Sequence, residues 1–125
     1  MSNKKILVVD DEHNIADLLM VVLTGAGYTV RAAYNGVEGL REVQSFQPNL
    51  VILDVNMPQL DGWGVLSSIR ATEATRKLPV LMCTQRDLIS DVERAEMLGA
   101  SGYIAKPFEI DRVLHKVQQM LSAPA

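Results

Sequence analysis

Cysteine is nearly absent from this sequence, since Cys83 is the single one among 125 residues. One cysteine excludes an internal disulfide and offers no metal-ligand spacing. Because Cys83 stands inside an apolar run, we interpret it as a small core residue rather than as a nucleophile.

Long apolar runs and clusters of positive charge are also missing. The apolar runs are too short to span a bilayer, and the N-terminus leads into a strand-like segment instead of a signal-peptide hydrophobic region. The formal net charge is -3 and no lysine- or arginine-rich block occurs, which argues against direct nucleic-acid binding. We therefore expect a soluble cytoplasmic protein with neither a membrane nor a nucleic-acid partner.

The composition that is present is ordinary for a globular protein. Apolar residues make up 48% of the chain and charged residues 22%. A length of 125 residues is common for one domain. We predict one domain over residues 1–125, built around one hydrophobic core.

Two short apolar runs end directly on acidic residues. Residues 50–53 run into Asp54, and residues 6–9 run into Asp10 and Asp11. Unbroken apolar runs of this length are typical of parallel strands buried on both faces. Further strands are predicted at residues 28–33, 79–83 and 102–105.

Segments with helical periodicity separate these strands. Asn14 or Asp11 could cap the first helix, and Gly99 is expected to end the fourth. Alternating strands and helices predict a parallel sheet with right-handed crossovers and helices on both faces, a three-layer α/β sandwich. The predicted inward positions, helix by helix, are Ile15, Leu18, Leu19 and Val22; Val37, Leu40, Val43 and Phe46; Trp63, Leu66 and Ile69; Leu88, Val92 and Ala95; and Ile110, Val113, Leu114, Val117 and Leu121.

Polar side chains recur where four of the predicted strands end. Taken singly, each is explained equally well as a helix cap or a solvated side chain, but packing gives no reason for polar groups at four strand ends together. Since the carboxyl ends of parallel strands share one edge of a sheet, we expect these groups to converge there. They are Asp10 and Asp11, Asp54, Thr84 and Lys106.

Such a cluster has a specific chemistry. Three crowded carboxylates repel one another unless a cation joins them, and all-oxygen ligation suits Mg²⁺. A magnesium ion, an ammonium and a hydroxyl are together suitable partners for phosphoryl oxygens. A central carboxylate could attack phosphorus and hold an acyl phosphate.

Four motifs resemble those of a known family in order and separation. They are Val8-Val9-Asp10-Asp11-Glu12, Leu53-Asp54-Val55-Asn56-Met57-Pro58 with Asp61-Gly62, Thr84, and Gly102-Tyr103-Ile104-Ala105-Lys106-Pro107-Phe108. Over essentially its whole length, the chain closely resembles the receiver domain of bacterial two-component response regulators, including the chemotaxis regulators. The resemblance implies a doubly wound, flavodoxin-like α/β fold with five parallel strands in the order 2-1-3-4-5.

The resemblance also implies the role of each site residue. Asp54 is then the phosphoacceptor, and Lys106 pairs with the phosphoryl group. The Mg²⁺ ligands are Asp10, Asp11, Asp54 and the main-chain carbonyl of Asn56.

Two further residues form the switch that the family implies. Thr84 moves toward the phosphoryl oxygens, and Tyr103 turns inward into the vacated space, which changes the surface of the fourth helix, fifth strand and fifth helix. A cis Lys106–Pro107 bond is also expected. In physical terms, phosphorylation stabilises one of two conformations.

The position after the switch threonine departs from the family, which usually has a small residue where this chain has Gln85. Gln85 could narrow access to Asp54, hydrogen-bond the phosphoryl group or point to solvent. Asn56 and Arg86 are expected to flank the hydrolytic water and so to tune the lifetime of the acyl phosphate.

The expected function is a phosphoacceptor switch. A sensor histidine kinase or histidine phosphotransfer protein donates to Asp54, and the altered surface engages a downstream protein. The chain is then not an enzyme, beyond assisting its own phosphotransfer and autodephosphorylation, and it is a monomer or a weak phosphorylation-dependent dimer.

Three alternative functions differ in the residues that they require. A phosphorylation-independent interaction module is favoured only by Gln85. An aspartate-nucleophile phosphatase would need a second carboxylate where Asn56 stands. The chain could also be the isolated receiver of a larger transcriptional regulator, although the segment 100–103 lacks the paired acids expected of such receivers.

Three remaining side chains have mainly structural interpretations. We expect Trp63 to pack in the core, and His13 and His115 to be solvated or capping residues because neither belongs to a metal-ligand spacing.

Overall fold

The structure is a computed structural model that describes residues 4–84 and 89–122. Strands and helices alternate along this part of the chain. The strands are β1 (Lys5–Val9), β2 (Thr29–Ala33), β3 (Leu50–Asp54), β4 (Val80–Thr84) and β5 (Gly102–Ala105). The helices are α1 (His13–Gly25), α2 (Gly36–Phe46), α3 (Gly62–Ala71), α4 (Ile89–Met97) and α5 (Ile110–Ser122).

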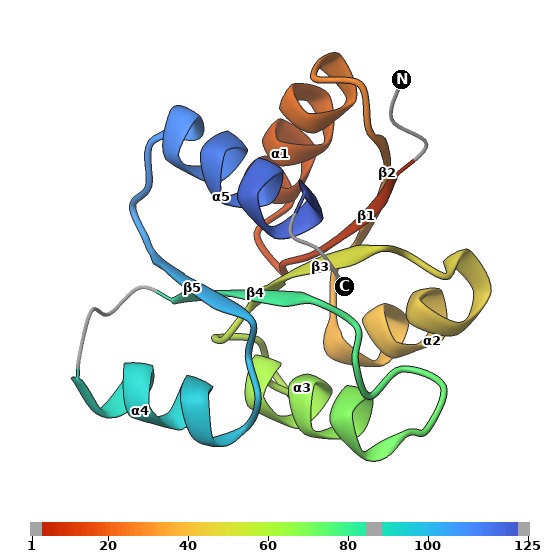
Figure 1. Cartoon of the computed structure of the whole chain (residues 1–125), viewed down its shortest axis with the longest axis vertical. Helices are drawn as coiled ribbons and strands as arrows, with labels where there is room; N and C mark the ends of the chain where they lie inside the picture. Colours follow the sequence, from red (N-terminus) through yellow and green to blue (C-terminus); the bar gives the residue numbers. More distant parts are fainter. Residues whose placement is uncertain (1–3, 85–88, 123–125) are drawn as a thin grey trace.

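The strands form one parallel sheet in the order β2-β1-β3-β4-β5. Helices α1 and α5 cover one face of the sheet, and α2, α3 and α4 cover the other (Figure 1). This is the doubly wound, flavodoxin-like sandwich predicted from the sequence. None of the helices within residues 4–84 and 89–122 has the length and hydropathy needed to cross a bilayer.

The central strands are buried because both of their faces are covered. Every residue of β3 and β4 is buried, whereas β2 alternates between exposed and half-buried positions before Ala33. The apolar runs therefore predicted the sheet centre correctly, and the mixed sequence of β2 places it at an edge.

The predicted single core is divided by the sheet into two apolar clusters. Leu7 and Leu53 belong to the cluster under α2, α3 and α4, while Ile6 and Ile52 belong to the cluster under α1 and α5. The division arises because successive side chains of a strand point to opposite faces.

Most predicted inward positions of the helices are confirmed, but Leu18 and Val37 are wrong. Their exposed fractions are 48% and 52%. Helix α1 instead turns Ala16 toward the sheet, together with Leu19 and Leu23. Leu88 lies outside the described residues.

Helix α2 approaches the sheet through glycine rather than through Val37. A Cβ atom on Gly39 would lie only 2.9 Å from Val9 Cγ1, so this close approach requires glycine. The rotation that brings Gly39 inward leaves Val37 in solvent.

Both expected caps of α1 are wrong. Its N-cap is Glu12, whose side chain makes no capping hydrogen bond. Asp10 instead accepts a hydrogen bond at Oδ1 from the Glu12 main-chain N–H, at 2.9 Å. Gly99 does follow α4 with φ +85, as predicted for a glycine that ends a helix.

Candidate functional site

Four buried polar side chains meet at the carboxyl edge of the sheet. Asp10 follows β1, Asp54 ends β3, Thr84 ends β4 and Lys106 follows β5. Among the described residues they are the buried polar and charged side chains, and all four belong to this one edge. The expected convergence of the strand ends is therefore observed.

The carboxylates are arranged to share a cation. Asp10, Asp11 and Asp54 each offer an oxygen, and these oxygens lie within 4.8 Å of one another. Asp54 Oδ1 is buried and accepts no hydrogen bond from any residue that the structure describes. A buried carboxylate oxygen without a donor needs another source of positive charge. The set of oxygens thus fits a hard divalent cation such as Mg²⁺.

Lys106 is the cation that the fold itself supplies. Its Nζ atom donates to Asp10 Oδ2 at 2.8 Å and lies 3.2 Å from Asp54 Oδ1. It also lies 3.4 Å from Glu12 Oε1. Glu12 was not among the site residues predicted from the sequence. Its place directly after Asp10 and Asp11 in the sequence is the feature that could have indicated it.

Burial and neighbouring charges change how this cluster ionises. Burial, followed by the charge of Asp10, raises the pKa of Asp54 from 3.8 to about 6, against the opposing charge of Lys106. Burial alone would lower the pKa of Lys106, but its hydrogen bond to Asp10 and the charge of Asp54 raise it above the ordinary value. Lys106 therefore remains a cation, while Asp54 is a carboxylate held at an energetic cost.

The start of α3 presses against the main chain of Asp54. Gly62 donates its N–H to the Val55 carbonyl at 3.0 Å, and a Cβ atom on Gly62 would lie 2.2 Å from the Asp54 carbonyl oxygen. Asp61 caps this helix by accepting from the Gly64 N–H at 2.9 Å. The Asp61-Gly62 pair thus has a physical reason, because only glycine allows the helix to start this close to β3.

The expected switch residues lie on the neighbouring strands. Thr84 is buried and stands in register with Ala105. Tyr103 is half-buried and packs against the apolar cluster under α2, α3 and α4. The Lys106–Pro107 peptide bond is cis, as expected.

The residues expected to tune the site have different outcomes. Asn56 is exposed in the loop after β3, and the role of its main-chain carbonyl as a metal ligand stays a prediction. Gln85 and Arg86 lie outside the described residues.

The side chains interpreted as structural are mostly confirmed. Cys83 is buried, and burial raises the pKa of its thiol to about 12, which removes it as a nucleophile at neutral pH. Trp63 is buried in the core beneath the guanidinium of Arg94, 5.0 Å from the ring centroid. His115 is exposed, and so is His13, whose ring in addition stacks on Tyr34.

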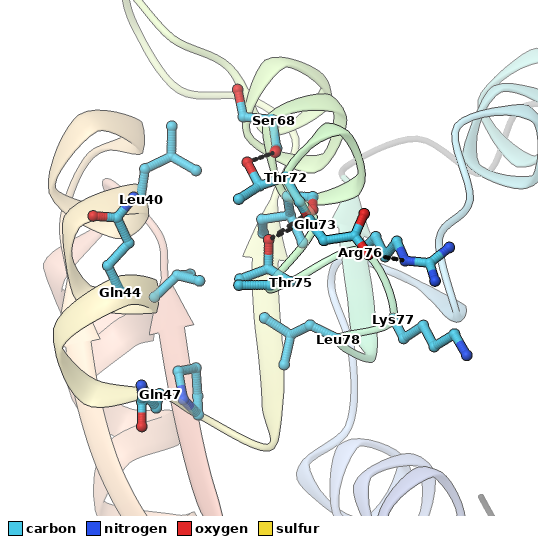
Figure 2. Close-up of a pocket in the computed structure, with 14 residues that line it drawn as sticks. Leu40, Gln44, Gln47, Ser68, Thr72, Glu73, Thr75, Arg76, Lys77 and Leu78 are labelled. Atoms are coloured by element: carbon cyan, nitrogen blue, oxygen red, sulfur yellow. Dashed lines mark hydrogen bonds and ion pairs between the residues drawn. The ribbon is translucent and has the colours of Figure 1, made fainter.

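A cavity of about 750 Å³ lies away from the polar edge of the sheet, between α2 and the connection from α3 to β4 (Figure 2). Leu40 and Gln44 face it from α2, and Leu78 faces it from the connection. The hydroxyls of Thr72 and Thr75 already donate hydrogen bonds to main-chain carbonyls, those of Ser68 and Ile69 respectively. Among the expected site residues that the structure describes, none lines this cavity, so the candidate site is the polar edge and not the cavity.

Comparisons with known proteins agree with the geometry. Residues 6–118 match the response regulator receiver domain family. The transcriptional regulator RpaA of Synechocystis is 37% identical over 117 residues, which cover 94% of this chain and 48% of that protein. PhoP of Bacillus subtilis, a transcriptional regulatory protein of alkaline phosphatase synthesis, is 40% identical over 119 residues, or 95% of this chain and 49% of that protein.

A solved structure gives the same result. The chemotaxis protein CheY4 of Vibrio cholerae superposes with a TM-score of 0.90 at 30% identity, covering 95% of this chain and 99% of that one. The chain spans about half the length of the curated relatives it matches. The family match, the similar sequences and the similar solved structure lead to one assignment. The chain belongs to the receiver domain family of two-component response regulators.

Proposed function

We propose that this chain is a phosphoacceptor switch in which Asp54 receives a phosphoryl group. The observation that carries the proposal is the buried Asp54 carboxylate, which has an oxygen without a hydrogen-bond donor among the described residues and the Lys106 ammonium 3.2 Å away. Such a carboxylate can act as a nucleophile toward phosphorus, and Lys106 is placed to pair with the phosphoryl oxygens that arrive with it.

The phosphodonor is the phosphohistidine of a sensor kinase or phosphotransfer protein. An Asp54 oxygen forms a bond to phosphorus while the bond between phosphorus and the donor nitrogen breaks, and the electron pair leaves with the imidazole. Lys106 pairs with one phosphoryl oxygen, and the Thr84 hydroxyl hydrogen-bonds another. Asp10, Asp11, Asp54 and the Asn56 carbonyl would hold Mg²⁺, which when bound neutralises charge on the phosphoryl group.

The output is a change of surface. Movement of Thr84 and Tyr103 favours one arrangement of α4, β5 and α5, so phosphorylation shifts the population toward the form that binds a downstream protein. Asn56, Gln85 and Arg86 tune the lifetime of the acyl phosphate. The protein acts in the cytoplasm, as a monomer or a weak phosphorylation-dependent dimer.

The relatives also support a role for this chain as one part of a longer protein. RpaA is named as a DNA-binding regulator, and this chain covers 48% of its length. The chain would then be the receiver part of a larger transcriptional regulator, and the phosphorylation chemistry would be the same.

The test is incubation with acetyl phosphate and Mg²⁺, followed by intact mass measurement. The wild type gains one base-labile phosphoryl group, while Asp54→Asn gains none. Asp61→Asn is a matched control, because it retains the helix cap and lies outside the acidic cluster, and it is phosphorylated. Unmodified wild type under these conditions would favour a phosphorylation-independent interaction module instead.

A further inference from the structure

Beside the acidic cluster, a stacked pair of rings joins the start of α1 to the end of β2. The His13 and Tyr34 ring centroids are 3.9 Å apart, and the ring planes differ by 13°. The Tyr34 hydroxyl donates to Asp17 Oδ1 at 2.8 Å. Since His13 and Asp17 are four residues apart on α1, they lie on the same side of the helix, and one tyrosine contacts both.

This contact occurs where α1 has little support of its own. The N-cap Glu12 makes no side-chain capping bond, and the first turn carries no acidic residue. The first N–H groups of a helix need such partners, and an uncapped first turn is less stable. The loop that enters this turn carries Asp10 and Asp11.

Tyr34 is in turn fixed by the sheet. It directly follows Ala33, the last residue of β2, whose carbonyl accepts a hydrogen bond from the Asp10 N–H at 3.1 Å. The end of β2 therefore contacts both sides of Asp11 in sequence, since the Ala33 carbonyl bonds Asp10 and the Tyr34 side chain contacts His13 and Asp17 of α1.

We propose that Tyr34 is a positioning residue for the metal ligands. By holding the first turn of α1 against the end of β2, it keeps the Asp10 and Asp11 carboxylates close to Asp54 against their mutual repulsion. The proposal rests on the proposed magnesium site. It predicts an effect on Mg²⁺ affinity, because groups outside the first coordination sphere that orient ligands typically change metal affinity by roughly 10-fold or more.

The test is calorimetric titration with Mg²⁺ of the wild type and of Tyr34→Leu. Tyr34→Leu should bind Mg²⁺ roughly 10-fold more weakly. Tyr34→Phe keeps the stacked ring but loses the hydrogen bond to Asp17, so its affinity should be intermediate. At saturating Mg²⁺, phosphorylation of Tyr34→Leu by acetyl phosphate should regain the wild-type rate.

Tyr28→Leu is the matched control, because Tyr28 lies before the opposite end of β2 and packs against the cluster under α1 and α5. It should lower the melting temperature without changing Mg²⁺ affinity. If Tyr34→Leu is too unstable to titrate, His13→Ala removes the same stack from the solvent side and should weaken Mg²⁺ binding several-fold.

The outcomes separate this inference from the proposed function. Wild-type affinity in the folded Tyr34 and His13 variants, with normal phosphorylation of the wild type, overturns the positioning role alone. A wild type that binds no Mg²⁺ and gains no phosphoryl group overturns both.

Discussion

Lys106 Nζ lies 3.2 Å from Asp54 Oδ1, yet that buried oxygen accepts no hydrogen bond from any residue that the structure describes. The two side chains form a buried ion pair, while the same ammonium donates a hydrogen bond to Asp10 at 2.8 Å. Asp54 therefore has a nearby cation that offsets part of its buried charge. This relationship leads to predictions about stability as well as about chemistry.

Removing the ammonium should leave the buried acids uncompensated. In Lys106→Met, measured at pH 7 with a chelator present, the free energy of unfolding should fall by about 3 kcal/mol, because a buried ion pair has lost one partner. Mg²⁺ should restore much of this loss. Urea unfolding with and without Mg²⁺ measures both effects, and the exposed Lys77 gives the control Lys77→Met, which should change neither. A Lys106→Met protein as stable as the wild type without metal would contradict the ion-pair account.

The raised pKa of Asp54 predicts the pH dependence of stability without metal. Its pKa is 3.8 ordinarily and about 6 in the fold, so the folded state binds more protons between these values. The stability contributed by protonated Asp54 is complete below about pH 4 and is lost as the pH rises through about 6. The difference in unfolding free energy between wild type and Asp54→Asn should therefore decline over this window by about 2 kcal/mol. Urea denaturation in a chelator across pH 4 to about 7 measures it, and a constant difference would contradict the raised pKa.

The close approach of α3 to β3 predicts that Gly62 tolerates no side chain. In Gly62→Ala the new Cβ would lie 2.2 Å from the Asp54 carbonyl oxygen, so the main chain of the phosphoacceptor or the helix must move. We expect a loss of about 2 kcal/mol in stability and slower phosphorylation by acetyl phosphate. Gly25→Ala is the control, since no atom lies within 4 Å of its added Cβ. That variant should be as stable as the wild type or slightly more stable.

The contact between Arg94 and Trp63 predicts a fluorescence change. The guanidinium of Arg94 lies 5.0 Å from the centroid of the tryptophan ring, and Trp63 is the single tryptophan of the chain. Arg94→Ala should lower stability by about 0.5–1 kcal/mol and raise quenching of the emission by iodide, because the ring loses its cover. Arg112→Ala on α5 removes the same charge at a distance and should leave the quenching near that of the wild type. Equal quenching in both variants would show that Arg94 does not cover the ring.

Local patterns in the sequence predicted the sheet and its polar edge correctly. Unbroken apolar runs identified β1, β3 and β4 because a strand covered on both faces needs apolar side chains at every position. The acids after β1 and at the end of β3 could be assigned to one edge because parallel strands share their direction. These inferences needed only neighbours along the chain and the rules of strand pairing.

The rotation of helices about their axes was harder to predict. Leu18 and Val37 satisfied the helical spacing but face solvent, since Ala16 and Gly39 fit closer to the sheet. Periodicity gives the width of an apolar stripe, whereas the packing distance to the sheet decides which side of that stripe is buried.

By itself, the sequence determined the order of strands and helices, the family and the residue types that meet at the carboxyl edge. Only the tertiary structure decided that Lys106 contacts Glu12 across 94 positions of the chain, and that Tyr34 stacks on His13 at the start of α1. The physical reason is that strand and helix formation depends on near neighbours in the chain. Ion pairs, ring stacking and the pKa of Asp54 depend on distances between residues that only the packed fold brings together.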